Sequence, residues 1–332
     1  MDKAIIVIHG GAGTIIKANM TDEKEEKFLN SLKAILVRGR EMLSNGSSAL
    51  DVVQEAVRMF EEDTLYNAGR GSVFTSDAIN EMDASIMDGR NIKAGGVASV
   101  STIRNPIIAA RKVMECTPHV LLIGKGAELF AQKNGVEIVD PSFFYTENRY
   151  QQLLRAKEEQ SLLLDHDGAN KVEERKQENS NDSKATSTDP IDPDKKFGTV
   201  GAVALDIHGN LASATSTGGM TNKMTGRVGD SPIIGAGCYA NNKTVAVSTT
   251  GTGEMFMRTL AAYDVSAMME YTGCTVEEAA KKVVFEKLLS IQGEGGLIAV
   301  DKNGNFSMTF NSEGMYRGYC KVNQEPNAFI YE

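Results

Sequence analysis

Thr199 follows Gly198 at a junction between two very different stretches of sequence. From Asp165 to Lys196 the residues are mostly charged or small and polar, whereas TVGAVALD (199–206) has the composition of a buried strand. A threonine that becomes a chain terminus carries a hydroxyl nucleophile and a free α-amine only a few bonds away. That amine has an ordinary pKa of about 7.7–8.0, so near neutral pH a useful fraction is an unprotonated base. The pair could attack an amide carbonyl without a histidine.

Gly198 suits the scissile position of a self-cleaving chain. Without a Cβ it tolerates the strained backbone that an N→O acyl shift requires. A Gly-Thr pair also occurs at ordinary strand starts, so the motifs around it must decide between the two interpretations.

Composition excludes several other classes of function. The 332 residues are 41% hydrophobic and 24% charged, which is typical of a globular protein, and the net charge of −9 argues against a nucleic-acid partner. No apolar run approaches the roughly 20 residues that span a bilayer. The start, MDKAIIVIHGGAG, reads as a strand and a turn rather than a signal peptide. Four scattered cysteines without CxxC spacing and four dispersed histidines indicate a cytoplasmic protein with free thiols and no zinc or His-based metal site.

The first half of the chain predicts strands and amphipathic helices in separate groups. The run 4–9 predicts a buried strand that ends at the glycines of HGGAG, and short strands are expected within 72–102 and at 119–124. Helices are expected at 22–44, 48–61 and 106–114. A long polar stretch then follows.

The stretch of about 157–197 is interpreted as a mobile linker. Its polar composition cannot bury enough apolar surface to offset the entropy of ordering, and it is too long for an ordinary connection. The alternative is a tolerated surface insertion.

After the linker, the sequence predicts strand hairpins and helix pairs. Strands are expected at 199–206, 211–219 and 243–250, helices at about 254–271 and 275–290, and final strands in GGLIAVD and NFSMTF. This segregation favours stacked helix and sheet layers over a doubly wound sheet.

Long ungapped motifs give the chain a resemblance to a known family. The motifs are HGGAG (9–13), LYNAGRGSVFT (65–75), EMDASIMDG (81–89), IRNPIIAARKVM (103–114) and the run from FGTVGAVALD to VSTTGTGE. They closely resemble the plant-type asparaginase and isoaspartyl peptidase family. The resemblance implies an α+β fold, the four-layer αββα sandwich of N-terminal-nucleophile hydrolases. It also implies self-cleavage into an α subunit (1–198) and a β subunit (199–332) that together form one domain, and a dimer of such processed heterodimers.

The same resemblance assigns roles to individual residues. Thr199 becomes the nucleophile, Gly198 the carbonyl donor of the self-cleavage, and Thr217 the hydroxyl that tunes the nucleophile. In GRVGD, Arg227 would bind the α-carboxylate of the substrate and Asp230 its α-ammonium, and opposite charges three residues apart suit a zwitterionic head group.

The turn TGTGE and the motif YNAG complete the implied site. Thr250 and Gly251 would stabilise the oxyanion, Thr252 and Gly253 would line the substrate, and Asn67 would lie beside the nucleophile. Read without the resemblance, Asn67 is equally well a turn residue.

The resemblance also implies a structural sodium ion, while catalysis needs no cofactor. The ion would be held by backbone carbonyls, which leave almost no signature in the side chains. The matching residues are Phe60, Glu61, Asp63, Tyr66, Ala68 and Arg70. The acidic trio of Glu81, Asp83 and Asp88 is interpreted as turn and core polar groups rather than a divalent-metal site.

These observations favour an amidohydrolase that releases L-aspartate from L-asparagine and β-aspartyl dipeptides. Two related enzyme classes remain as alternatives: glycosylasparaginases, which are typically exported and disulfide-bonded, and protein-cleaving threonine aspartases. A different class, a non-catalytic Gly-rich anion-binding protein, is favoured only by the Gly-rich turn before a helix, because GxxxxGK[ST] and a helix-opening GxGxxG are absent.

Overall fold

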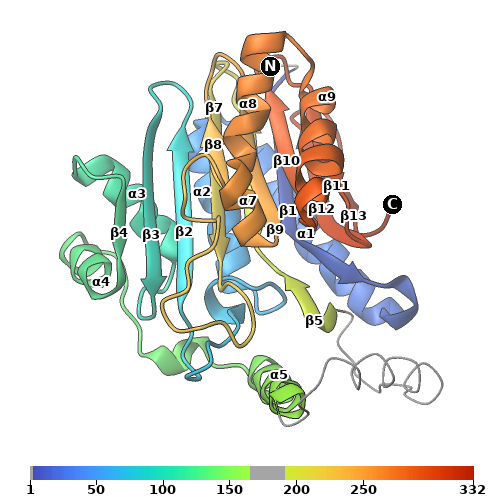
Figure 1. The fold of residues 1–332 in the computed structure, drawn as a ribbon. Coiled ribbons are helices and arrows are strands. Elements are labelled where there is room, and N and C mark those ends of the chain that lie inside the picture. The colour runs from blue at the N-terminus through green and yellow to red at the C-terminus, as the bar shows by residue number, and fades with distance from the viewer. Residues whose placement is uncertain (1–2, 165–190) are drawn as a thin grey trace.

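The computed structural model describes residues 3–164 and 191–332, which form two β-sheets flanked by helices (Figure 1). In spatial order, the larger sheet contains β13 (Asn327–Phe329), β12 (Gly314–Lys321), β1 (Ile5–Ile15), β6 (Val200–Leu205), β7 (Leu211–Thr217), β2 (Met82–Asp88), β3 (Lys93–Val100) and β4 (Leu121–Ile123), with β5 (Ile191–Phe197) also paired to β1. The smaller sheet contains β11 (Phe306–Phe310), β10 (Gly295–Asp301), β9 (Val245–Gly251) and β8 (Cys238–Ala240).

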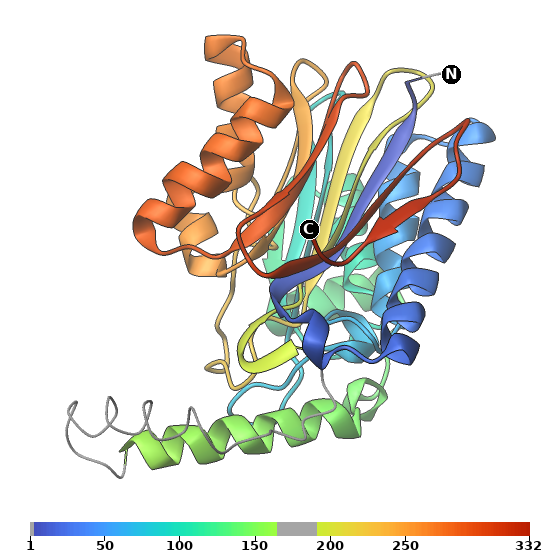
Figure 2. The ribbon, with the colours of Figure 1, turned by 90° about the vertical axis from the view of Figure 1, so that its right-hand side faces the viewer.

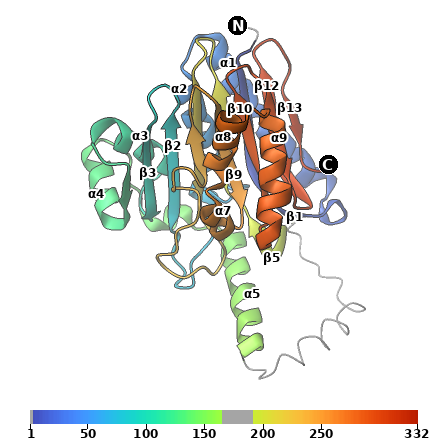
Figure 3. The same ribbon diagram turned by 45° about the horizontal axis from the view of Figure 1, so that its top comes forward.

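Helices cover the outer face of each sheet (Figure 2). Against the larger sheet lie α1 (Asp22–Ser44), α2 (Ala49–Glu62) and α3 (Pro106–Cys116), with α4 (Gly124–Lys133) beside the β4 edge. Against the smaller sheet lie α7 (Gly253–Thr259), α8 (Ala261–Thr272), α9 (Val276–Lys281) and a π-helical continuation (Lys282–Leu288). The helix α5 (Glu147–Leu164) extends from one end of the molecule (Figure 3). The 3₁₀ turns are Lys17–Asn19, Gly69–Gly71, Pro141–Phe144 and Leu289–Ile291. Among the described residues, no helix combines the length and the apolar character needed to cross a bilayer.

Strand β1 shows why its sequence is a continuous apolar run. Ile6 and Ile8 pack into the core between the larger sheet and its helices, while Ile5 and Val7 pack into the core between the two sheets. Successive side chains of a strand point to opposite faces, so a strand covered on both sides is apolar throughout. A third apolar core fills the space between the smaller sheet and its helices.

The helices predicted at 22–44 and 48–61 are confirmed, but the single helix predicted at 254–271 is wrong. It breaks at Leu260, which adopts a left-handed conformation with φ 49°. The N–H groups of Ala262 and Tyr263 donate instead to the carbonyls of Ala236 and Gly235, at 3.2 and 2.8 Å. Because these acceptors come from a distant loop, no local glycine or proline marks the break.

The linker predicted at about 157–197 overlaps the end of helix α5 and the whole of strand β5. Helix α5 continues to Leu164 through KEEQSLLL, a run of mostly good helix formers, and β5 begins at Ile191. Strand pairing of β5 with β1 uses backbone groups, so a polar composition does not prevent it. The central part of the predicted linker, 165–190, lies outside the described residues.

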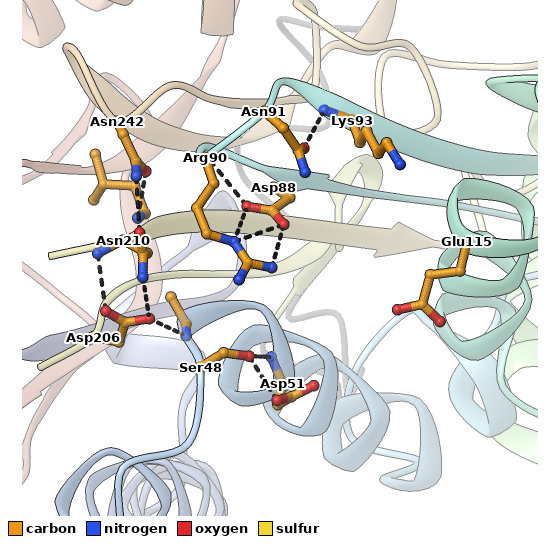
Figure 4. A network of polar contacts seen from close by, with 12 residues as sticks. Ser48, Asp51, Asp88, Arg90, Asn91, Lys93, Glu115, Asp206, Asn210 and Asn242 are labelled. Carbon is orange, nitrogen blue, oxygen red and sulfur yellow. Dashed lines mark hydrogen bonds and ion pairs between the residues drawn. The ribbon is translucent and has the colours of Figure 1, made fainter. Parts of the chain in front are cut away.

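A polar network joins the turns at the end of the sheets where β6 leads into β7 (Figure 4). Asp206 accepts hydrogen bonds from the N–H groups of Ala49 and Asn210, at 3.0 and 2.9 Å. Asp88 forms an ion pair with Arg90 at 2.6 Å. Thr217 is at the other end of the β6–β7 hairpin, so this network anchors the strands at the end remote from the candidate site.

Candidate active site

The Gly198–Thr199 junction lies between two strands that pair with the same side of β1. Strand β5 pairs with β1 as far as Phe197, and β6 pairs with β1 from Gly201 onward. The junction is therefore held on both sides by backbone ladders, and only its few residues lie outside them. In the uncut chain the nitrogen of Thr199 is an amide nitrogen and cannot act as a base.

Thr199 and Thr217 are brought together by the pairing of β6 with β7, in which Val200 lies opposite Ser216. Thr199 is 6% exposed, and its Oγ1 donates a hydrogen bond to the Oγ1 of Thr217 at 3.1 Å. The same Thr217 oxygen accepts a hydrogen bond from the N–H of Gly219 at 3.0 Å. Two hydroxyls predicted to act together thus form a hydrogen-bonded pair.

Asn67 lies against the residue that precedes the nucleophile. A methyl group on Gly198 would overlap the Cβ of Asn67, so this close approach requires glycine. The Asn67 amide donates to the carbonyl of Gly219 at 2.6 Å and accepts from the N–H of Val73 at 3.0 Å. Asn67 is therefore beside the Gly198–Thr199 junction, and it is linked to Thr217 through Gly219.

A small cavity unites most of the predicted site residues. Its lining consists of Gly198, Thr199, Thr217, Gly219, Met220, Arg227, Gly229, Asp230, Ser231 and Gly251. The residues predicted to be the nucleophile (Thr199), an oxyanion donor (Gly251) and the head-group clamp (Arg227 and Asp230) therefore line one cavity.

Arg227 and Asp230 both line this cavity. Asp230 is almost completely buried, and burial raises the pKa of its carboxyl to about 6, although the hydrogen bond from Thr249 at 2.7 Å and the charge of Arg227 act in the opposite direction. The Arg227 guanidinium donates from Nε and Nη2 to the two oxygens of Glu254, both at 2.9 Å. A methyl group on Gly253 would lie 2.9 Å from Asp230 Oδ1 and 3.0 Å from Arg227 Nη2, so Gly253 allows the two charges to approach α7.

Of the four predicted residues at the end of β9 and in the turn that follows it, Thr250, Thr252 and Gly253 are not among the residues that line the cavity. Gly251 lines the cavity, and the fully buried Thr250 accepts a hydrogen bond from the N–H of Ala12 at 3.3 Å. The hydroxyl and N–H of Thr252 are both directed at the carbonyl of Glu294, at 3.4 and 2.9 Å. Thr252 is the residue that precedes α7, and its two hydrogen bonds to Glu294 anchor the turn.

Two neighbours of the site were not singled out from the sequence. Glu254 follows the motif TGTG directly, but only the tertiary structure shows that it pairs with Arg227. His9 is fully buried in HGGAG, with Nε2 2.9 Å from Ser248 Oγ. Burial lowers the pKa of His9 to about 3, against the effect of a hydrogen bond with the Thr199 backbone, so its imidazole is neutral.

The residues predicted to hold sodium run from the last turn of α2, which contains Phe60 and Glu61, into the loop that follows this helix. Methyl groups on Gly69 and Gly71 would overlap the carbonyl oxygens of Glu61 and Tyr66 respectively, so the glycines let this turn fold tightly over backbone oxygens. Closely packed carbonyl oxygens suit a hard cation better than any side-chain set. Among the described residues, no three His, Cys, Asp or Glu side chains are grouped to hold a metal ion.

Two acidic residues of the β2 region, interpreted from the sequence as turn and core polar groups, accept hydrogen bonds from backbone N–H groups. Asp83 accepts from the N–H of Ser99 at 2.9 Å, and Glu81 accepts from the N–H of Gly226 at 2.8 Å.

The fold consists of two sheets flanked by helices, and the candidate site contains a pair of hydrogen-bonded threonines. Comparison with known proteins identifies the family of this chain. The chain belongs to the asparaginase family, whose model, described as Asparaginase, matches residues 2–330. The isoaspartyl peptidase of Escherichia coli (strain K12) is 54% identical over 331 residues, which cover 100% of this chain and 97% of the relative. A Dictyostelium discoideum protein provisionally named an isoaspartyl peptidase/L-asparaginase is 63% identical over 327 residues (96% and 94%). The isoaspartyl peptidase/L-asparaginase of Mus musculus is 42% identical over 311 residues (94% and 86%).

Proposed function

We propose that this chain is an isoaspartyl peptidase and L-asparaginase that activates itself by cutting the Gly198–Thr199 bond. The observation that carries the proposal is the Thr199–Thr217 hydroxyl pair at 3.1 Å, which shares a cavity with Arg227 and Asp230. Full-length identity to relatives named for these two activities supports it. The arrangement of layers is that of the four-layer αββα sandwich of N-terminal-nucleophile hydrolases.

Self-cleavage begins with attack of Thr199 Oγ1 on the carbonyl carbon of Gly198. The C–N bond breaks, an ester forms between Gly198 and Thr199 Oγ1, and the hydroxyl proton ends on the freed amine. Water then hydrolyses the ester, leaving a carboxylate on Gly198. The ladders on both sides of the junction hold the two residues in place during the attack. The products are an α subunit of residues 1–198 and a β subunit of residues 199–332.

Turnover uses the freed α-amine of Thr199 as the general base. Thr199 Oγ1 attacks the side-chain carbonyl of L-asparagine or of a β-aspartyl dipeptide, and ammonia or the second amino acid leaves with the proton. Thr250 Oγ1 and the N–H of Gly251 stabilise the oxyanion, each contributing roughly 3–4 kcal/mol to the lowering of the barrier. Water then releases L-aspartate from the acyl-enzyme and regenerates the hydroxyl.

The head group of the substrate is held by the charged clamp. Asp230 accepts from the substrate α-ammonium and Arg227 donates to its α-carboxylate. Glu254 occupies Nε and Nη2 of Arg227 as donors, so Nη1 remains for the substrate.

We further propose that the loop after α2 holds a structural sodium ion on its carbonyls and that catalysis needs no cofactor. The carbonyls of Glu61 and Tyr66, packed against Gly69 and Gly71, support the sodium site. Four free cysteines support a cytoplasmic location. Assembly as a dimer of processed heterodimers follows from the family resemblance, and size-exclusion chromatography of the processed protein tests it.

Denaturing electrophoresis of fresh wild-type protein and of Thr199→Ala tests the proposal. The wild type should give two bands of about 21 and 14 kDa, the shares of the 35.8 kDa chain on either side of the bond, and should release ammonia from L-asparagine. Thr199→Ala should remain one chain without activity. Thr272→Ala, which changes an exposed threonine at the end of α8, is the matched control and should behave like the wild type. Two bands from Thr199→Ala would exclude the mechanism.

A further inference from the structure

Lys223 is a buried lysine in the loop between β7 and the Arg227–Asp230 clamp. The residue is only 6% exposed, and its Nζ donates a hydrogen bond to the carbonyl oxygen of Glu81 at 2.8 Å. Burial lowers the pKa of its ammonium group, while the charge of Asp83 acts in the opposite direction. Burial of an ammonium is unfavourable unless polar contacts compensate for lost water.

The main chain of Lys223 is also fixed. Its carbonyl accepts a hydrogen bond from the N–H of Ser76 at 2.8 Å, and its N–H donates to the carbonyl of Met220 at 3.2 Å. The starting point and the tip of the side chain are therefore both anchored to the segment that precedes β2.

Between these anchors, the Lys223 side chain lies across Gly219. A methyl group on Gly219 would lie 2.7 Å from Nζ and 2.8 Å from Cδ of Lys223. Gly219 in turn donates its N–H to Thr217 and accepts from the amide of Asn67 through its carbonyl. Lys223 thus packs against a residue that connects Thr217, the hydrogen-bond partner of Thr199, to Asn67.

Asp83 is the carboxyl group that raises the pKa of Lys223 most strongly. It is fully buried on β2, in register with Thr217 of β7, and its Oδ1 accepts from the N–H of Ser99. Its Oδ2 has no hydrogen-bond partner within the part of the chain that the structure describes. Burial raises the pKa of the Asp83 carboxyl, and the charge of Lys223 acts in the opposite direction, so each of the two buried groups favours the charged form of the other.

We propose that Lys223 is a positioning residue of the hydrolase: anchored on the Glu81 carbonyl, it holds the Gly219 peptide so that Thr217 Oγ1 receives the hydrogen bond of the nucleophile. This inference rests on the proposed function and adds to it a residue that does not line the substrate cavity. Its effect is on the alignment of reacting groups, so it acts on kcat and on self-cleavage, whereas binding of the substrate head group depends on Arg227 and Asp230.

The test compares Lys223→Met, Lys223→Arg and the control Lys243→Met with the wild type. Lys243 is an exposed lysine just before β9, at the opposite end of that strand from the site. Lys223→Met removes the charge and the donor but keeps an unbranched side chain. It should lower kcat for L-asparagine by about 10–100-fold with KM within about threefold, because a misplacement of about 1 Å can cost about 100-fold. It should also slow self-cleavage, while Lys223→Arg, which retains a charged donor, should recover part of kcat.

The outcomes separate this inference from the proposed function. A wild type that neither cuts itself nor releases ammonia would contradict the proposed function. An active wild type together with a fully active Lys223→Met would contradict the role of Lys223 alone. A rise in KM without loss of kcat, or loss of folding in both Lys223 variants as judged by thermal unfolding, would also contradict it, since the lysine would then serve substrate binding or the fold.

Discussion

Thr199 Oγ1 donates a hydrogen bond to Thr217 Oγ1 over 3.1 Å, and this bond links the residue before β6 to the last residue of β7. Thr217 Oγ1 also accepts from the N–H of Gly219, so its position is fixed from the protein side. The Thr199 hydroxyl, which we propose as the nucleophile, therefore has a defined hydrogen-bond partner without any substrate. This arrangement lowers the entropy that must be lost to reach the transition state.

Thr217→Val should lower kcat for L-asparagine by about 10–100-fold while changing KM little. Valine has the shape of threonine but cannot accept the hydrogen bond of the nucleophile, and a bond of this kind contributes roughly 1.5–3 kcal/mol when one group carries charge in the reaction. Steady-state ammonia release from fully processed enzyme measures the effect. Thr217→Ser, which keeps the hydroxyl, is the control and should retain most activity. Equal losses in both variants would assign the role to packing instead.

Asp230→Asn should weaken substrate binding and stabilise the fold at the same time. The pKa of Asp230 in the folded chain, about 6, is higher than its ordinary value of 3.8, so the folded state favours the neutral carboxyl. The resulting destabilisation is absent below pH of about 4, grows as pH rises to about 6, and is complete above that. Asn removes it, so the variant should melt higher than the wild type at pH 8 but not at pH 4. The same melting difference at both pH values would contradict this account.

The KM of the wild type for L-asparagine should rise as pH falls through about 6. Protonated Asp230 carries no charge to pair with the α-ammonium group of the substrate. In Asp230→Asn, KM should be high already at pH 8, by about 30-fold or more, and should lose this dependence on pH. Initial rates between pH 5 and 8 provide the measurement, and a parallel rise of KM in both proteins would show that another group titrates.

Gly198→Ala should slow self-cleavage without harming the enzyme once it has been cut. The added methyl group would overlap Asn67 Cβ, and overpacking of this kind costs about 1–3 kcal/mol. We expect cleavage to be about tenfold slower or more in a time course followed by denaturing electrophoresis. The processed fraction should keep the wild-type kcat per active site, since residue 198 is then a chain end. Reduced kcat in the processed fraction would contradict this separation.

Leu260→Gly should stabilise the fold by about 0.5–1 kcal/mol. A left-handed conformation costs a residue with a Cβ about 1–2 kcal/mol, and glycine avoids this cost although it loses more entropy on folding. Leu289 is the matched control because it is equally exposed, at 48%, but right-handed helical with φ −60°. Leu289→Gly should destabilise the fold by about 1 kcal/mol. Urea unfolding measures the free energy of unfolding of both variants. Destabilisation of similar size in both would contradict the prediction.

Local patterns in the sequence were sufficient to predict several features of the fold and the family. The apolar run of β1 and the periodicity of α1 and α2 follow from burial on one or both faces of an element. The change from a polar stretch to a strand at Gly198 pointed to Thr199, and the motifs around it pointed to the family to which the chain belongs. The roles of the individual site residues remain proposals.

Contacts between residues far apart in the sequence became visible only in the folded structure. Gly219 connects Thr217 to Asn67, residues 150 positions apart, and the Lys223 side chain covers it, although nothing in the spacing of these residues reveals the contact. The break at Leu260 and the strand β5 likewise depend on backbone partners elsewhere in the chain. Backbone hydrogen bonds and close packing are insensitive to side-chain pattern, so a sequence can name the reacting groups without showing what holds them in line.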